Sequence, residues 1–567
     1  MMVLKYQIAT MLVVTAAVAG LVSDPVGAGA LPEAPRVFVD TTYVPPAGKT
    51  ISVQAGGSLQ AALDAAQPGD VIELQAGASW RGTFHLRNKT TGSGWVTIRS
   101  SRHAELPPPG TRVNPAEAPL MAKLVAPGVS RVIETDEGAH HYRFVGIEIT
   151  GETLAATAQN NRFIQLDGEH SAGTRVIYQT TLEQVPHHLI FDRCYVHAGP
   201  EGGGDYIRGF VLNSAHTAIV DSHVSGFKSR GTDTQAIAGW NGPGPFKLQN
   251  NYLEAAAENV MFGGAVGTLP NIVPSDIEIR GNLFSKPLNW RIGDPSYAGI
   301  PWVVKNLFEI KNGQRILVED NIFQDHWAQA QSGWAIVTSP RVQGGRNSWA
   351  VASDVMFRNN VFRRTTAGVY IWGHDNVTTY VQSARVALVN NVFEDLGLYV
   401  VSGAFNGALM MLQNGIQDFT FAHNTVFNTG PILMFSHPPT DGLSTGLVIQ
   451  DNIMRGGGYL ISGTGTGFGV AALEAQAPGW VFDHNVVAGP WPTDKGVPHT
   501  APRIPQNNFF PNSVDEVGFV NLAGGDYRLS TASRYQNAGT DGRAPGADVS
   551  AGPLKRMHGG RTGSSAR

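Results

Sequence analysis

The sequence predicts an all-β solenoid, an elongated stack in which short strands and turns repeat at a nearly regular period. A short motif recurs ten times: apolar residues, one or two polar residues, an asparagine or its replacement, and a further apolar residue. The segments between its copies are alternating runs rich in Val, Ile and Phe, bounded by Gly, Asn, Asp and Pro, with no helical period. Because the period is 28 to 39 residues and the local pattern is that of strands, we expect stacked β-coils.

The asparagine position of the motif marks successive coils. Successive anchors are 29, 28, 31, 39, 39, 31, 33, 28 and 33 residues apart. An asparagine at a fixed turn suits a left-handed backbone, and its amide can bond to the asparagine of the next coil. We therefore interpret the column as scaffold, which makes its two non-asparagine members poor candidates for a nucleophile or a ligand. The anchors are Cys194, His223, Asn251, Asn282, Asn321, Asn360, Asn391, Asn424, Asn452 and Asn485.

Composition and charge exclude several classes of protein. A chain of 567 residues is too long for one ordinary compact core, but an elongated repeat adds length without thickening its core. Hydrophobic residues are 42% of the chain, which excludes a disordered protein. The formal net charge of −4 gives no electrostatic reason to expect nucleic acid or an anionic membrane as partner. The single cysteine, Cys194, excludes an intrachain disulfide and a cysteine-cluster metal site.

The first 30 residues have the pattern of a secretory signal peptide. Lys5 precedes an apolar run over 8–22, and small residues follow it. The run is shorter than the ~20 residues that a spanning helix needs, so an uncleaved anchor is the weaker alternative. We predict a secreted or periplasmic protein with no membrane span after signal removal, an N-terminal extension over 31–47 and a flexible C-terminal tail over 546–567.

An amphipathic helix is predicted over 58–66, with Ser58 as its N-cap, and an alternating strand over 69–74. Such a helix would cap the open end of a strand stack. Here the chain resembles bacterial secreted right-handed parallel β-helix proteins of the pectate-lyase-like superfold, which commonly open with a helix and a Pro-Gly-Asp-x-Ile-x-Leu strand. The resemblance covers 48–545. It implies an all-β right-handed parallel β-helix of about a dozen coils with an N-terminal capping α-helix, and this fold alone does not define a function.

A second column of strands is predicted to carry chemistry on its outer face. If Phe308 and Ile310 point inward, alternation turns the residues between and after them outward, and the same holds on the next two coils. The outward set combines a carboxylate, an amine, a guanidinium, an imidazole and two aromatic rings: Glu309, Lys311, Arg341, His374, Tyr370 and Trp372. Aromatic rings stack on sugars and cations hold uronate carboxylates, so we predict an acidic polysaccharide as partner.

Cleavage of such a polymer by β-elimination needs a neutralised uronate carboxylate, a base with a lowered pKa, and an acid for the leaving oxygen. A lysine crowded by an arginine would have its pKa lowered, so Lys311 is the candidate base and Arg341 its catalytic partner. The competing interpretation is a solvated ion pair between Glu309 and Lys311, with Arg341 covering a loop.

The same stretch resembles polysaccharide lyase family 6, the alginate and dermatan lyases. The resemblance lies in Phe308-Glu-Ile-Lys311-Asn-Gly followed by Thr338-Ser-Pro-Arg341. It implies that Lys311 and Arg341 inherit the family's catalytic roles. The family's calcium-binding glutamates lie further before the lysine, where this chain has Val304 and Asn306, so Glu309 is the candidate metal ligand and calcium the candidate cofactor.

Two alternative functions remain open. Asp233 and Glu258, with Trp240 and Asn241 nearby as substrate contacts, suit a glycoside hydrolase that needs two carboxylates on facing coils. The aspartate runs that mark β-helix polygalacturonases are absent, and turn chemistry explains the same residues. The other alternative is a non-catalytic surface rod that binds polysaccharide.

The remaining features add two expectations. The segment 286–304 interrupts the repeat, and such insertions usually flank the binding face. The adjacent pairs His140-His141 and His187-His188 should diverge on a strand, so we do not expect them to bind a metal. The sequence thus predicts a monomer that acts on an acidic polysaccharide and does not bind nucleic acid.

Overall fold

The computed structural model describes residues 29–168, 170–172, 175–177, 179–200, 203–455, 457, 459–489, 505–550 and 554. The predicted signal peptide, except for its last two residues, and most of the predicted C-terminal tail lie outside these residues. Among the helices that the structure does describe, none combines the length and the apolar character needed to cross a membrane.

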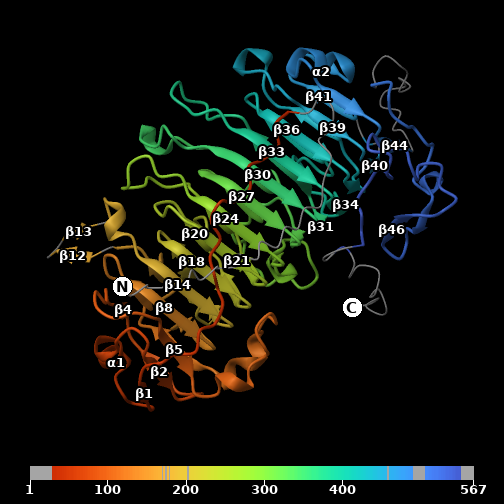
Figure 1. Ribbon diagram of the computed structural model, residues 1–567. Helices are drawn as coiled ribbons and strands as arrows, with labels where there is room; N and C mark the ends of the chain where they lie inside the picture. Colours follow the sequence, from red (N-terminus) through yellow and green to blue (C-terminus); the bar gives the residue numbers. More distant parts are fainter. Residues whose placement is uncertain are drawn as a thin grey trace, which may run out of the picture.

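Three long sheets run along the molecule, and each turn of the chain adds one strand to each (Figure 1). Sheet A consists of β1 (Thr50–Val53), β2 (Val71–Leu74), β5 (Val96–Ser100), β8 (His140–Val145), β14 (His187–Asp192), β18 (Ala215–Val220), β21 (Phe246–Gln249), β24 (Ser275–Arg280), β27 (Gly313–Glu319), β30 (Ala352–Arg358), β33 (Ala384–Val389), β36 (Gln417–Ala422), β39 (Val448–Gln450) and β43 (Val481–Asp483). Sheet B consists of β3 (Ser79–Arg81), β6 (Ala122–Ala126), β9 (Ile147–Gly151), β15 (Tyr195–His197), β19 (His223–Phe227), β22 (Tyr252–Ala255), β25 (Leu283–Ser285), β28 (Ile322–His326), β31 (Val361–Thr365), β34 (Val392–Leu396), β37 (Thr425–Val426), β40 (Ile453–Arg455) and β44 (Val486–Ala488).

Sheet C consists of β4 (Phe84–Leu86), β7 (Ile133–Thr135), β11 (Ile164–Leu166), β17 (Arg208–Leu212), β20 (Gln235–Gly239), β23 (Glu258–Phe262), β26 (Phe308–Ile310), β29 (Trp334–Thr338), β32 (Ala367–Trp372), β35 (Met410–Gln413), β38 (Leu433–Phe435), β41 (Ile461–Gly463) and the antiparallel β42 (Gly467–Phe468). All other neighbours in the three sheets pair in parallel, as β26 does with β29. The predicted right-handed parallel β-helix of about a dozen coils is therefore confirmed.

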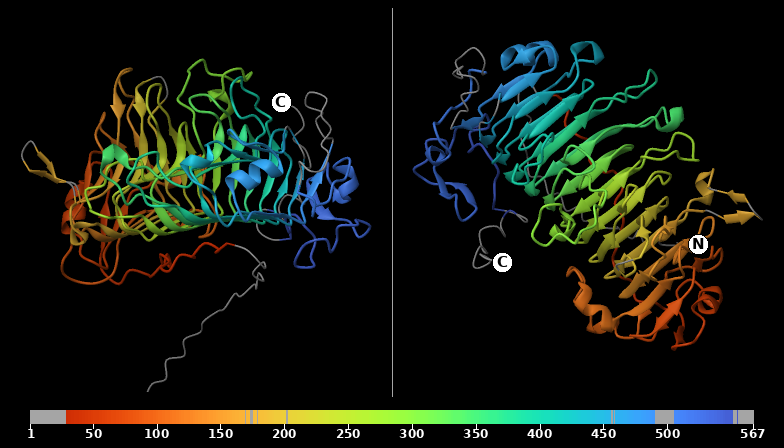
Figure 2. Two further views of the ribbon diagram at one scale, coloured as in Figure 1. Left: turned by 90° about the horizontal axis from the view of Figure 1, so that it is seen from above. Right: turned by 180° about the vertical axis from the view of Figure 1, so that it is seen from behind.

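Smaller elements lie outside the three sheets. They are the pairs β10 (Gln159–Asn160) with β16 (Asp205–Tyr206), β12 (His170–Ala172) with β13 (Arg175–Ile177), and β45 (Phe519–Asn521) with β46 (Asp526–Leu529). Short 3-10 helices span His103–Glu105, Pro115–Leu120, Leu182–Gln184, Leu288–Trp290, Gln343–Gly345, Pro439–Asp441 and Asp515–Val517. Figure 2 shows the coils stacked side by side, with the β12–β13 hairpin projecting from one edge of the stack.

Helices lie toward the two ends of the coil stack (Figure 2). Helix α1 (Leu59–Ala65) buries Leu59, Ala62 and Leu63, and the Ser58 side chain accepts a hydrogen bond from the Ala61 amide. This confirms the predicted capping helix and its N-cap. Helix α2 (Val470–Gln476) packs against β41 and β42 near the other end.

The core is a continuous column of side chains that repeat from coil to coil. On sheet B, the rings of Phe284, Phe323, Phe362 and Phe393 stack at centroid separations of 4.4, 4.8 and 4.4 Å, and all four are fully buried. In-register parallel pairing places identical residues one above the other, so the repeat in the sequence becomes a stack in space. Each stacked pair buries apolar surface, the main stabilising contribution in a chain of this composition.

The asparagine column forms the predicted ladder between sheets A and B. From Asn251 to Asn485, each Oδ1 accepts the backbone N–H of the preceding coil's asparagine at 2.8 to 3.0 Å; Asn251, the first, accepts that of Ser222. Two details correct the prediction. Ser222, and not His223, takes the ladder position, because its amide donates to Asn251 while His223 begins strand β19. The left-handed residue is the one before the ladder asparagine, as at Asn359 with φ 59°.

We expect Asn360→Ala to lower the free energy of unfolding by about 2 kcal/mol, because it leaves two buried backbone groups of the preceding coil without partners. The Asn321 amide loses its acceptor and the Val318 carbonyl loses its donor. Urea unfolding measures the loss, and Asn88→Ala, at an exposed asparagine, is the control. Equal midpoints for the two variants would show that the ladder does not stabilise the coils.

The segment from Gly29 to Lys49 lies across the outer face of sheet A (red in Figure 1). It runs in the direction opposite to the coils, from Asp418 beside Gly29 to Gly69 beside Gly48. The Glu33 and Arg36 amides donate to Asp354 and Asp276 at 2.9 Å each, and the Gly48 amide donates to the Gly69 carbonyl. This extension therefore covers sheet A and not the outer face of sheet C.

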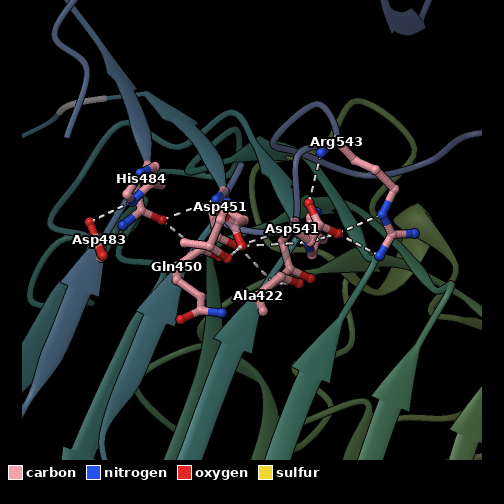
Figure 3. A network of polar contacts seen from close by, with 12 residues as sticks. Ala422, Gln450, Asp451, Asp483, His484, Asp541 and Arg543 are labelled. Atoms are coloured by element: carbon pink, nitrogen blue, oxygen red, sulfur yellow. Dashed lines mark hydrogen bonds and ion pairs between the residues drawn. The ribbon is translucent and has the colours of Figure 1, made fainter. Parts of the chain in front are cut away.

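The C-terminal segment 505–550 folds back along the coils instead of continuing them. Tyr527 packs in a buried cluster with Val361 and Val392 of sheet B, and Thr540 donates its amide and hydroxyl to the Asp451 carboxylate. Figure 3 shows Asp541, paired with Arg543, beside Asp451. Sheet A is thus covered by the N-terminal extension, and sheet B by part of the C-terminal segment.

Candidate functional site

The outer face of sheet C carries the predicted column of side chains. Glu309 of β26 lies in register with Met261, Val337 and Tyr370 of neighbouring strands. Phe308, on the other side of the same strand, is fully buried in the core. The alternation on which the sequence prediction depends is therefore confirmed.

Lys311 is held at the end of β26 by its neighbours on both sides. Its amide donates to the Phe262 carbonyl at 2.7 Å, and its carbonyl accepts the Arg341 amide at 3.0 Å. A Cβ atom added to Gly263, whose φ is 89°, would lie 2.4 Å from the Asn312 nitrogen, and one on Gly264 would lie 3.1 Å from the Lys311 Cδ. Gly263 therefore leaves space for the backbone at residues 311 and 312, and Gly264 leaves space for the lysine side chain.

Glu309 is a buried carboxylate with a cation beside it. Its Oε1 accepts the Ser339 hydroxyl at 3.0 Å, and its Oε2 accepts the Asn306 amide at 3.1 Å. The Lys311 Nζ lies 3.6 Å from Oε2, and 18% of the lysine side chain is exposed. The pair is thus anchored in the wall of the helix while its ammonium end reaches the surface, which differs from a solvated surface ion pair.

Arg341 follows strand β29, one coil after Lys311, and has a different carboxylate partner. Its Nη1 donates to Asp375 at 3.1 Å, and the Val342 amide donates to the other oxygen of Asp375 at 2.7 Å. The guanidinium lies over the Trp372 ring, 4.3 Å from the ring centroid, with about a third of the side chain exposed. Lys311 and Arg341 are therefore two cations on neighbouring coils, each with its own carboxylate.

Glu258, at the start of β23, has a perturbed environment. Its Oε2 accepts the Gln235 amide at 2.6 Å, while its Oε1 has no hydrogen-bond partner among the described residues. Burial raises the pKa of Glu258 to about 7, repulsion from Glu309 and Asp233 adds to the rise, and Lys311 opposes it. Strongly perturbed carboxylates of this kind concentrate at functional sites.

The other residues predicted for a glycoside hydrolase, Asp233, Trp240 and Asn241, each contact a different part of the chain. Asp233 pairs with Lys305, whose Nζ lies 2.6 Å from its Oδ2. The Trp240 ring lies 5.8 Å from the guanidinium carbon of Arg208. Asn241 is buried, and its Oδ1 accepts the amides of Thr268 and Leu269, so its side chain shapes a turn.

The aromatic residues of β32 form one wall of the face. Tyr370 donates its hydroxyl to Gln413, and its ring lies 5.5 Å from that of Trp372. His374 is buried with its two nitrogens at 2.6 and 3.0 Å from the carbonyls of Asp375 and Asp441, so it supports the loop that follows β32. Beyond Arg341 lies a cavity of about 510 Å³, lined among others by His374, Asp375, Tyr380, Gln413, Ser436 and Asp441.

A second cavity, of about 440 Å³, lies on the sheet B side, with Tyr195, His197, Lys228 and Trp290 in its wall. The Lys228 Nζ lies 5.2 Å from the ring centroids of both Trp290 and Trp302, which belong to the inserted segment 286–304. Trp290 of the insertion therefore lines this cavity, and Trp302 packs with Trp290 in a buried cluster.

Sequence reasoning missed Gln235 and Asp375, the side chains that contact Glu258 and Arg341. Neither belongs to a motif, and each meets its partner only through the register of neighbouring coils, 23 and 34 residues away. The sequence offered one usable signal for Asp375. Asp375 lies in the turn after β32, which corresponds to the turns after β26 and β29 that carry Lys311 and Arg341.

Comparison with known proteins gives structural likeness at low identity. No family model matches the chain, and no curated protein matches it. A polysaccharide lyase of family PL6 from Pseudopedobacter saltans is 12% identical over 87% of this chain and 99% of its own, with a TM-score of 0.41. The catalytic unit of a GH87 α-1,3-glucanase from Streptomyces thermodiastaticus is 13% identical over 80% and 71%, with a TM-score of 0.40. A family 28 exopolygalacturonase from Yersinia enterocolitica is 12% identical over 82% and 76%, with a TM-score of 0.30.

Proposed function

We propose that this protein is a secreted or periplasmic lyase that cleaves an acidic, uronate-containing polysaccharide by β-elimination on the outer face of sheet C. The observation that carries the proposal is the position of Lys311 beside the buried Glu309, with Arg341 on the neighbouring coil. The signal-peptide pattern over 1–30 supports export. Two cations and an aromatic wall on one face suit an anionic sugar chain.

In this reaction the Lys311 Nζ, after it has released a proton to water, removes the C5 proton of the uronate; the C4–O4 bond breaks, and a C4–C5 double bond forms. The positive charge that develops on Nζ lies 3.6 Å from the Glu309 carboxylate, which stabilises it in a buried setting. Glu309 is held in place by Ser339 and Asn306, so it does not have to reorganise during proton transfer.

Arg341 neutralises the uronate carboxylate, which makes the C5 proton more acidic. Stacking on Trp372 and the contact with Asp375 hold its guanidinium plane, and the exposed third of its side chain is the part that substrate meets. The leaving oxygen takes its proton from water in the open groove.

Calcium at Glu309 does not fit the residues as they stand. Both oxygens of Glu309 already accept hydrogen bonds, and a lysine ammonium occupies the position that a cation would need. Calcium requires six to eight oxygen ligands, so no step of the proposed reaction uses it.

A glycoside hydrolase is the second candidate, and Glu258 favours it. A carboxyl group with a pKa of about 7 suits a general acid, and Glu309 and Asp233 are charged groups near it. Glu258 is fully buried, and Asp233 is engaged by Lys305, so this reaction would need the site to open.

We expect ultraviolet absorbance to rise when the protein is mixed with alginate, pectate, chondroitin or dermatan, because β-elimination leaves an unsaturated uronate. Parallel reactions with calcium and with a chelator should run at equal rates. New reducing ends without absorbance would support hydrolysis instead. If no substrate gave absorbance or new reducing ends while the polymer still bound, the result would support a non-catalytic rod.

A further inference from the structure

Five histidine side chains gather on the outer face of sheet A, away from the proposed catalytic face. They come from three successive strands and stack in two columns. His140 lies over His187 at a ring-centroid separation of 4.9 Å, while His141, His188 and His216 follow one another at 4.5 Å. All five are half-buried.

Backbone conformation explains why adjacent histidines share one face. His141, His188 and His216 have φ values of 59°, 55° and 45°, in the left-handed region. A left-handed residue breaks the alternation of a strand, so the predicted divergence of His140 from His141, and of His187 from His188, is wrong. The Nδ1 atoms of the two pairs lie 2.8 and 2.6 Å apart instead.

The cluster offers nitrogen donors at the spacing of a metal site. Ring nitrogens of His141, His187 and His188 all lie within 4.8 Å of one another. Each imidazole offers one ring nitrogen as a ligand atom, and histidine is the commonest metal ligand among side chains.

The chemistry of the donor set selects the class of ion. Imidazole suits Zn²⁺, Ni²⁺ and Cu²⁺, whereas calcium and magnesium prefer oxygen ligands. The neighbours of His187 in the cluster are other imidazole rings, with His140 stacked on it at 4.9 Å and His188 edge-on at 4.9 Å between ring centroids. The Trp95 ring packs edge-on against His141, 5.1 Å between centroids, and gives the cluster an apolar side.

We propose that this histidine cluster is a binding site for one transition-metal ion of the zinc class, with ligands from His141, His187 and His188 and a further ligand from His140 or His216. The ion would join strands β8 and β14 of sheet A, and also β18 where His216 supplies the further ligand. It would stabilise the N-terminal half of the helix, independently of any reaction on sheet C.

The test uses the untagged full chain, stripped with a chelator and titrated with Zn²⁺ by isothermal calorimetry. We expect one Zn²⁺ per chain. The double variant His187→Phe/His188→Asn should bind at least ~10-fold more weakly. Phenylalanine keeps the ring stack, and asparagine tolerates the left-handed backbone at 188. Replacing Zn²⁺ by Co²⁺ should give the visible absorption of imidazole coordination, and the variant should lose it.

Another candidate cluster among the described residues, His423 with Asp451 and Asp541 near the C-terminal segment, offers a matched control; Figure 3 shows its two aspartates. His423→Ala should leave Zn²⁺ affinity unchanged. Circular dichroism and the unfolding midpoint in chelator show whether the double variant is folded. No Zn²⁺ binding by the parent chain, or loss in His423→Ala with full binding in the folded double variant, would overturn the proposal.

Discussion

Lys311→Ala is expected to lower kcat on the cleaved polysaccharide by a factor of about 10² to 10⁴, the usual contribution of a positioned general base. The KM should change little, because Arg341 and the aromatic wall still hold the polymer. The variant removes the amine that faces Glu309 and leaves the backbone contacts of residue 311 intact. Initial rates of ultraviolet absorbance measure kcat, and polymer binding is measured separately.

Two further variants make this result specific. Lys247→Ala removes a lysine that pairs with Glu278 on sheet A, and its rate should equal that of the parent. Glu309→Gln should lower kcat while leaving the amine present, because the charge formed on Lys311 loses its counterion. A Lys311→Ala variant with parental turnover would remove Lys311 from the role of base.

The sequence predicts the fold well because each coil repeats the same local pattern. Alternation placed Phe308 inside and Glu309 outside, and Ser58 marked the start of the capping helix. The errors occur where single residues leave that pattern. Left-handed conformations at His141 and His188 turned adjacent side chains to one face, and such conformations are uncommon outside glycine.

The site was predictable only as far as strand alternation reaches. Strand alternation identifies which side chains face outward. It does not show which of them meet when neighbouring coils differ in length. Asp375 holds Arg341 and Gln235 holds Glu258 because of register between coils that differ in their loops. His374 faces outward by alternation, yet a following loop buries it against the Asp441 carbonyl.

Glu258→Gln is expected to raise the free energy of unfolding at pH 8 by on the order of 3 kcal/mol relative to the parent chain, if the pKa of Glu258 is about 7 in the folded state. The ordinary pKa of this carboxyl is 4.5. Between these two values the folded chain binds more protons than the unfolded chain. Stability from this group is therefore full below about pH 4.5 and is lost as the pH rises through about 7.

The difference between the two proteins removes the contributions of groups that Glu258 does not affect, and leaves those of Glu258 itself and of the buried Lys286, whose pKa the Glu258 charge raises. Several histidines with lowered pKa, such as His188 and His223, contribute the opposite slope, since their folded forms bind fewer protons between about pH 4 and 6.5. These groups are common to both proteins and cancel. Urea unfolding of parent and variant at pH 5, 6, 7 and 8 should give stabilities that lie close together at pH 5, separate progressively through pH 6 and 7, and differ by a nearly constant amount above pH 7.

Activity of the same variant then separates the two candidate reactions. If Lys311 is the base of a lyase, Glu258→Gln removes a buried charge near it and leaves most of the turnover. If Glu258 is the general acid of a hydrolase, its amide cannot donate the proton and turnover falls by about 10² to 10⁴. Parallel curves at every pH would instead show that Glu258 titrates normally. A stabilised variant with full activity would identify the carboxylate as part of the wall that surrounds Lys311, whereas a stabilised and inactive one would place the chemistry on Glu258 itself.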